Sequence, residues 1–153
     1  MQELTREKAR LVFSAFEGTK EEILRTESEL ANRGFMVVSN NSAHRWTKDV
    51  PMMLPEVNPD HLKLIEEQTS YKEASGGIIV KPNCSIQSYV PVLKAWEEFG
   101  IQDIFVVTEQ SISGAGKTFA EWPQMEDNVI PHISGEEEKS EREPLKVLGT
   151  RVE

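Results

Sequence analysis

Runs of hydrophobic residues separated by polar stretches predict an α/β fold. Three short, mainly apolar runs are typical of strands buried on both faces of a parallel sheet: residues 9–15, 35–39 and 78–80. Between the first two runs, residues 20–32 place apolar side chains on one helical face. Thr19 is the predicted N-cap of this helix, and Gly34 is placed to end it. Strand, helix and strand in this order predict a βαβ unit and therefore a parallel sheet.

The rest of the chain is predicted to be mixed in structure. In chain order, the expected elements are an extended run at 50–54, a weak helix at 59–67, a polar link at 69–77, a helix at about 85–99, a strand at 101–108, a small-residue loop at 113–116, a surface excursion at 118–127 and a charged helix at 136–148. Gly100 is placed to end the helix that begins near Ser85. Pro144 lies inside the last helix, where a proline removes a backbone donor.

The single cysteine, Cys84, lies between a predicted strand and a predicted helix. Pro82 ends the strand because it has no N–H group for a ladder, and residues 83–85 then begin the helix. A thiol at a helix N-terminus meets free N–H groups and the positive end of the helix dipole, and both favour the thiolate. Cys84 is therefore a candidate nucleophile. The alternative is a small apolar core residue, which is the role of many lone cysteines.

A polar loop at 40–49 follows the second predicted strand. In open α/β sheets ligands bind beyond the carboxyl ends of the strands, so this loop is a candidate binding site. Arg45 is able to hold a phosphate or a carboxylate through two hydrogen bonds; the alternative is a solvated loop arginine. Three dispersed histidines lack the spacing of metal ligands, so no metal site is expected, and nothing in the sequence supports a Cys–His hydrolase: His44, His61 and His132.

Composition narrows the partners that we expect. The chain has 153 residues, of which 28% are charged, and its formal net charge is −9. This acidic balance argues against nucleic acids and anionic membranes, while local basic groups still allow a small anionic substrate. One cysteine excludes an internal disulfide framework and fits a reducing cytoplasm. The apolar runs are too short to span a membrane, and the charged N-terminus is unlike a signal peptide.

Six motifs follow one another along the chain. They are Ser-Asn-Asn-Ser-Ala-His-Arg at 39–45, Pro-Glu-Val-Asn-Pro-Asp-His at 55–61, Lys-Pro-Asn-Cys-Ser at 81–85, Gln-Ser-Ile-Ser-Gly-Ala-Gly at 110–116, Asp-Asn-Val-Ile-Pro-His-Ile-Ser-Gly-Glu-Glu-Glu-Lys at 127–139 and Arg-Glu-Pro-Leu-Lys-Val-Leu-Gly at 142–149. All six resemble motifs of aspartate-semialdehyde dehydrogenases, in the branch found in archaea, fungi and some bacteria. The similarity covers nearly the whole chain from Leu11 onward and keeps the order of the family.

The resemblance implies roles for five residues in substrate chemistry. Cys84 corresponds to the nucleophile that forms an acyl-enzyme thioester, and Gln110 to the glutamine that orients the substrate. Arg45 and Lys146 correspond to phosphate ligands, and Glu143 to the carboxylate that binds the substrate's amino group. The reaction of the family interconverts aspartyl phosphate and aspartate semialdehyde with NADP(H), on the pathway to lysine, threonine, methionine and isoleucine. Neutralising the leaving phosphate and holding the substrate at two points suits attack by a thiolate.

The resemblance also implies a cofactor, a domain division and an oligomeric state. NADP is the expected cofactor, and NAD stays possible. Six residues are expected to border it, of which Ser113 and Gly114 belong to the loop under the nicotinamide: Ser14, Asn40, Ser42, Asn83, Ser113 and Gly114. Residues 1–82 are expected to form the C-terminal part of a Rossmann-like NAD(P)-binding domain. Residues 83–153 are expected to begin an α+β dimerisation and catalytic domain, and full-length members form homodimers or homotetramers.

The chain departs from the family in length. It lacks the glycine-rich dinucleotide-binding turn, the catalytic histidine and the arginine that binds the substrate carboxylate. We therefore expect the central portion of such an enzyme, with no useful dehydrogenase activity by itself. Two alternatives stay open: a malonyl-CoA reductase, which shares these motifs and reduces a thioester, and a non-catalytic dimerisation remnant. The sequence leaves the choice between NADP and NAD, and any partner chain that supplies the absent parts, undetermined.

Overall fold

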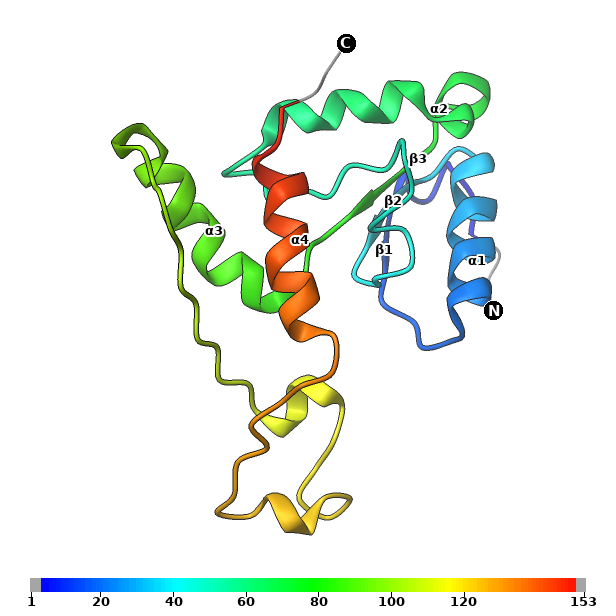
Figure 1. Cartoon of the computed structure of the whole chain (residues 1–153). Coiled ribbons are helices and arrows are strands. Elements are labelled where there is room, and N and C mark those ends of the chain that lie inside the picture. The colour runs from blue at the N-terminus through cyan, green and yellow to red at the C-terminus, as the bar shows by residue number, and fades with distance from the viewer. Residues whose placement is uncertain (1–3, 151–153) are drawn as a thin grey trace.

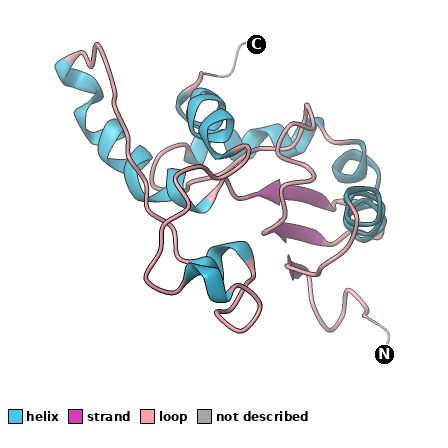
Figure 2. Ribbon diagram, turned by 60° about the horizontal axis from the view of Figure 1, so that its bottom comes forward, coloured by secondary structure: helices cyan, strands magenta, loops and turns pink. Residues whose placement is uncertain are grey.

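Three short parallel strands form the sheet, as the apolar runs predicted. The computed structural model describes residues 4–150, and the strands are β1 (Leu11–Ser14), β2 (Met36–Ser39) and β3 (Gly77–Val80). They are hydrogen-bonded in the order β1-β2-β3, with Ser14 opposite Ser39 and Ser39 opposite Val80. The last residues of all three strands therefore lie at one edge of the sheet. In Figure 2 the arrowheads point away from α1 and α2 and towards α3 and α4.

Helix α1 (Lys20–Asn32) connects the first two strands as expected. The Thr19 side chain accepts a hydrogen bond from the backbone N–H of Glu22, and the Glu22 carboxylate accepts one from the backbone N–H of Thr19, which completes a capping box. Gly34 follows the helix with a φ of +87°, a conformation that favours glycine. Gly76 brings the chain very close to the end of α1, because a Cβ atom there would lie 2.0 Å from the carbonyl oxygen of Ala31.

The connection from β2 to β3 contains more helix than the sequence predicted. Residues 50–54 run extended, and Met52 forms a single parallel bridge with Val80. The predicted weak helix is the 3₁₀ helix η1 (Pro59–Glu67). The prediction of a polar link at 69–77 was wrong, since α2 (Thr69–Ala74) lies within it. None of its side chains is buried, so it has no apolar stripe that would give a helical pattern.

Helices α3 (Cys84–Trp96) and α4 (Glu136–Leu148) pack against each other beyond the carboxyl ends of the strands (Figure 1). The Tyr89 hydroxyl donates to the Ser140 carbonyl at 3.1 Å and joins the two helices. The main core links strands, connection and helices: Ala31, Val37, Val50, Met52, Leu54, Val57, Ile78, Val80, Ile86, Val90 and Val147. Within residues 4–150, no helix is both long and apolar enough to cross a lipid bilayer.

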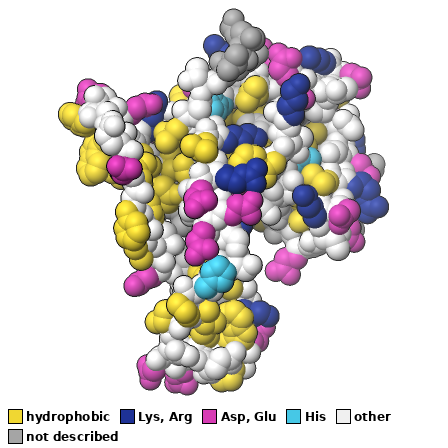
Figure 3. Space-filling model, viewed as in Figure 1, with side chains coloured by type: hydrophobic (Ala, Val, Ile, Leu, Met, Phe, Trp, Pro, Cys, Tyr) yellow, Lys and Arg dark blue, Asp and Glu magenta, His cyan; other side chains and the backbone are white. Residues whose placement is uncertain are grey.

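The prediction of a strand at 101–108 was wrong. After α3, the short 3₁₀ helix η2 (Glu97–Phe99) ends at Gly100, and the chain then runs extended without pairing to another strand of the described residues. Phe105 is 92% exposed and Val107 is 74% exposed. A strand needs both a hydrogen-bonding neighbour and a surface to cover, and this segment has neither here. Figure 3 shows hydrophobic side chains gathered along α3 and in the segment beneath it.

Candidate active site

Cys84 is the first residue of α3, directly after the turn that follows β3. Its side chain is exposed, whereas those of its neighbours Asn83 and Ser85 are buried. The Sγ atom donates to Oδ1 of Asn83 at 3.3 Å. Asn83 occupies the N-cap position, but its side chain makes no capping hydrogen bond to α3. The thiol thus lies at an uncapped helix N-terminus and is open to solvent, as a nucleophile requires.

A buried ion pair lies against the backbone just before Cys84. Nη1 of Arg45 donates to Oε1 of Glu143 at 3.0 Å, and the side chains are 9% and 1% exposed. Nε of Arg45 donates to the carbonyl oxygen of Lys81 at 3.2 Å. The other carboxylate oxygen of Glu143 accepts from the backbone N–H of Asn83 at 2.7 Å. The pair therefore connects the loop after β2, the turn before Cys84 and helix α4.

Lys146 adds a second cation to this cluster. Its ammonium donates to the carbonyl oxygens of Arg45 at 2.7 Å and Val50 at 3.0 Å. Burial lowers the pKa of Lys146, and the negative charge of Glu143 opposes that effect. The ammonium also lies 5.8 Å from the centre of the Trp46 ring. Arg45, Glu143 and Lys146 together carry one net positive charge, which suits a site for an anion.

Glu136, at the start of α4, joins both residues that flank Cys84. One carboxylate oxygen accepts from Nδ2 of Asn83 and from the hydroxyl of Ser85, the latter at 2.6 Å. Burial alone raises the pKa of Glu136, but hydrogen bonds from Ser85 and Asn83 and the nearby amide of Gln110 outweigh burial, so the pKa is lowered. Nζ of Lys139 is 3.6 Å from the other oxygen and acts in the same direction.

A second buried carboxylate, Glu27 on α1, lies at the ends of β1 and β2. One of its oxygens accepts from the hydroxyls of Ser14 at 2.6 Å and Ser39 at 2.7 Å and from the amide of Asn41 at 3.1 Å. The other oxygen has no hydrogen-bonding partner among the described residues and lies 3.8 Å from Nε2 of His44. This network fixes the last residues of β1 and β2 and the start of the loop at 40–49.

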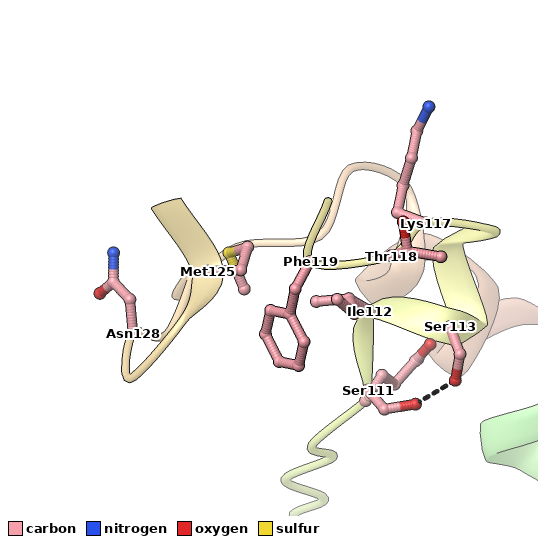
Figure 4. Close-up of a pocket in the computed structure, with 9 residues that line it drawn as sticks. Ser111, Ile112, Ser113, Lys117, Thr118, Phe119, Met125 and Asn128 are labelled. Carbon is pink, nitrogen blue, oxygen red and sulfur yellow. Dashed lines mark hydrogen bonds between the residues drawn. The ribbon is translucent and has the colours of Figure 1, made fainter. Parts of the chain in front are cut away.

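Five of the six cofactor residues expected from the sequence lie in two places, and Asn83 lies beside Cys84. Asn40 and Ser42 are exposed on the loop after β2, while the hydroxyl of Ser14 is buried and engaged by Glu27. Ser113 and Gly114 lie in the 3₁₀ helix η3 (Ile112–Ala115), beneath α4 in Figure 1. Beside η3 is a hollow of about 550 Å³ that continues along the segment containing η4 (Pro123–Met125). In Figure 4 the side chains of Ile112, Phe119 and Met125 gather there, Lys117 points away, and Ser111 is hydrogen-bonded to Ser113.

The structure thus brings together five of the eleven site residues singled out from the sequence. The turn at 81–85 collects the nucleophile candidate and the charged cluster: Cys84, Asn83, Arg45, Glu143 and Lys146. Sequence reasoning missed Glu27 and Glu136. Glu27 gave a signal, because it falls on the same helical face as the buried Ile23 and Ala31, four residues from each. Glu136 gave none, since it is one of three consecutive glutamates.

Stability should depend on pH through His44. Burial lowers the pKa of His44 below its usual 6.5, although the charge of Glu27 and the Leu24 carbonyl oppose this. Between the lowered value and 6.5 the unfolded chain binds more protons, so the free energy of unfolding falls as the pH falls through this window. We expect urea unfolding at a series of pH values to show a flatter dependence for His44→Asn. The exposed His132 serves as the control, and an equal change of slope in His132→Asn would contradict the assignment.

Comparisons with known proteins identify relatives of this chain. The family model described as the NAD-binding domain of semialdehyde dehydrogenase matches residues 1–65. The aspartate-semialdehyde dehydrogenase of Archaeoglobus fulgidus is 44% identical over 142 residues, which cover 92% of this chain and 40% of that protein. The NADP malonyl-CoA reductase of Metallosphaera sedula is 35% identical over 123 residues, covering 80% of this chain and 34% of that protein.

A solved structure shows the same fold. The crystal structure of aspartate-semialdehyde dehydrogenase with NADP from Candida albicans matches with a TM-score of 0.70 and 33% identity, covering 94% of this chain and 40% of that one. The chain spans about 40% of the length of these dehydrogenases. Similarity in sequence and in fold thus confirms the resemblance that the six motifs indicated. This chain belongs to the aspartate-semialdehyde dehydrogenase family.

Proposed function

We propose that this chain supplies the nucleophile and the anion-binding cluster of an NADP-dependent aspartate-semialdehyde dehydrogenase. The reaction converts L-aspartyl 4-phosphate, NADPH and a proton into L-aspartate 4-semialdehyde, NADP⁺ and phosphate. The observation that carries the proposal is the exposed thiol of Cys84, placed at a helix N-terminus immediately after the backbone held by Arg45 and Glu143. We also propose a cytoplasmic enzyme of amino-acid biosynthesis that assembles as a homodimer or homotetramer, with its domains divided near residue 82.

Cys84 performs the covalent step. Its thiolate attacks the carbonyl carbon of the acyl phosphate, the bond from that carbon to the phosphate oxygen breaks, and phosphate leaves with its electron pair. The N–H groups at the start of α3, which the Asn83 side chain does not cap, are placed to stabilise negative charge on the carbonyl oxygen. NADPH, when bound, supplies the hydride that reduces the resulting thioester. Release of the aldehyde then returns the thiolate.

The charged cluster positions the substrate. Aspartyl phosphate carries both an ammonium group and a phosphate, so it can exchange the internal ion pair for two pairs with substrate. Glu143 then binds the ammonium and Arg45 the phosphate, and each charge stays paired as burial requires. Lys146, already held by the Arg45 carbonyl, adds the second cation for phosphate. Gln110, which lies near Glu136 at the start of α4, orients the substrate.

Two features fit a dinucleotide. Asn40 and Ser42 are exposed at the carboxyl edge of the parallel sheet, where such cofactors bind. Ser113 and Gly114 adjoin a hollow lined in part by Ile112, Phe119 and Met125, and this apolar lining suits the face of a nicotinamide ring. Ser14 contributes indirectly, because its hydroxyl is engaged by the buried carboxylate of α1.

Acyl transfer tests the proposed function without requiring NADPH. Incubation of the chain with aspartyl phosphate should form an aspartyl thioester on Cys84, because the nucleophile and the phosphate site belong to the same chain. Intact mass spectrometry should detect the adduct, and hydroxylamine should remove it. Cys84→Ser, which removes the only cysteine, should abolish it.

Two further arms make the result specific. Lys146→Met should slow adduct formation by about 10-fold or more through the loss of a phosphate ligand. Lys94→Met is the matched control, since Lys94 is an exposed lysine on α3 that pairs with Glu97. Faster transfer from malonyl-CoA than from aspartyl phosphate would favour the reductase chemistry named for the Metallosphaera sedula relative. Absence of any Cys84 adduct would contradict both assignments.

A further inference from the structure

The hydrogen-bonding partners of the Asn83 side chain are unusual for an N-cap residue. An asparagine at the N-cap normally accepts a hydrogen bond from the second or third N–H group of its own helix, a contact worth about 1 kcal/mol. Here that contact is absent among the described residues. The amide instead donates through Nδ2 to Glu136 on α4, and its Oδ1 accepts from the thiol of Cys84. Asn83 thus joins Cys84 to the carboxylate of Glu136, which lies 52 positions after Cys84 in the chain.

Glu136 determines which way the Asn83 amide points. A carboxylate accepts hydrogen bonds and donates none, so it selects the orientation in which the NH₂ group faces α4. The pKa of Glu136 is lowered, so the carboxylate is ionised at neutral pH. Its second bond, from the Ser85 hydroxyl at 2.6 Å, fixes it on the far side of Cys84. Both residues that flank the nucleophile are therefore held by the same oxygen atom.

This orientation has a chemical consequence for the thiol. With NH₂ facing Glu136, the carbonyl oxygen of the amide faces Sγ and accepts a hydrogen bond from the thiol. A hydrogen bond to the neutral form favours that form, so Asn83 opposes the thiolate that the α3 N-terminus favours. The reversed amide would instead donate to the sulfur and stabilise the thiolate. Glu136 excludes that reversal because it cannot donate.

We propose that Glu136 is a positioning residue that fixes the Asn83 amide and thereby holds the resting thiol of Cys84 in a hydrogen bond that slows its reaction. The proposal rests on the proposed function of Cys84 as the nucleophile. It adds a control on reactivity: the thiol is restrained in the resting protein, and a change at the start of α4 releases it.

The alkylation rate of Cys84 in the full chain tests the proposal. Iodoacetamide reacts with the thiolate, and the chain has no second cysteine to confuse the readout. Glu136→Gln removes the charge and allows the amide to turn, so alkylation at neutral pH should be about fivefold faster. Glu136→Asp keeps the charge but shortens the reach to Asn83, and it should also accelerate alkylation. A charge effect without positioning would leave Glu136→Asp at the wild-type rate and would overturn the proposal.

A double-mutant cycle separates action through Asn83 from action on the sulfur directly. In an Asn83→Ala background, Glu136→Gln should change the rate by less than about twofold. Glu137→Gln is the matched control, because Glu137 carries the same charge one residue further along and is exposed. The same acceleration by Glu136→Gln with and without Asn83 would reject the mechanism. Since no turnover is measured, failure of acyl transfer and failure of this inference are distinguishable.

Discussion

Replacing Glu143 by glutamine is expected to lower the free energy of unfolding by about 3–5 kcal/mol. The carboxylate is 1% exposed and is the partner of the Arg45 guanidinium at 3.0 Å, so its loss leaves a buried cation without an anion. The substitution also weakens the hydrogen bond that the backbone N–H of Asn83 donates to the second carboxylate oxygen. Because the free energy of unfolding of a domain of this size is typically about 5–15 kcal/mol, this loss is a large share of the stability.

Urea unfolding followed by circular dichroism measures this loss. Glu141→Gln is the matched control, since Glu141 is exposed on the same helix and should cost less than about 0.5 kcal/mol. Glu143→Gln should also cost less in an Arg45→Met background, where no buried cation is left behind. Equal losses in the Glu143 and Glu141 variants would show that the ion pair contributes little to the fold.

Glu27→Ala is expected to have the second large effect, a loss of about 3–5 kcal/mol. One oxygen of Glu27 accepts three hydrogen bonds, and the alanine variant leaves the two serine hydroxyls and the Asn41 amide without their acceptor. Glu27→Gln retains an acceptor of the same shape and should lose only about 1–2 kcal/mol. The difference between the two variants measures the hydrogen-bond network rather than the bulk of the side chain.

The control for this prediction is Glu29→Ala, an exposed glutamate on the same helix. Its loss should stay within about 0.5 kcal/mol, because alanine is a good helix former and no tertiary contact is removed. Amide hydrogen exchange adds a local measurement. Residues 39–45 should exchange faster in Glu27→Ala than in Glu29→Ala, since Glu27 holds the first residues of that loop. Unchanged exchange there would contradict its role in fixing the loop.

Much of the fold followed from local signals that agree with each other. Thr19, the helical face of α1 and Gly34 each specify the same helix, and the apolar runs on both sides specify strands. The expectation that the first strand is buried was wrong, because Leu11 and Phe13 of β1 are exposed. The start of α3 was likewise visible, because Pro82 ends a strand just before a helical pattern. Where pattern, capping and turn chemistry point to one structure, the sequence alone predicts it well.

The predictions that failed depended on neighbours. Residues 101–108 have the composition of a strand, but strand formation requires a partner that lies elsewhere in a chain. Helix α2 has no buried side chain, so tertiary position rather than pattern reveals it. Charged partners were the hardest to foresee: Arg45 and Glu143 are 98 positions apart, and only the fold shows that they neutralise each other. The roles given to single residues by family resemblance therefore needed the structure to show which charges are already paired.

The extended segment after α3 also affects how the protein is best handled. Phe105 and Val107 are largely exposed, as are Phe99 and Trp96 at the end of the helix before them. Environment-sensitive dyes that fluoresce on apolar surfaces report unfolding only when the native state hides such surfaces. Here the folded chain should already bind such a dye, so thermal-shift screens based on dye fluorescence should begin with a high signal and give a shallow transition. Circular dichroism is the better measurement of thermal unfolding for this molecule.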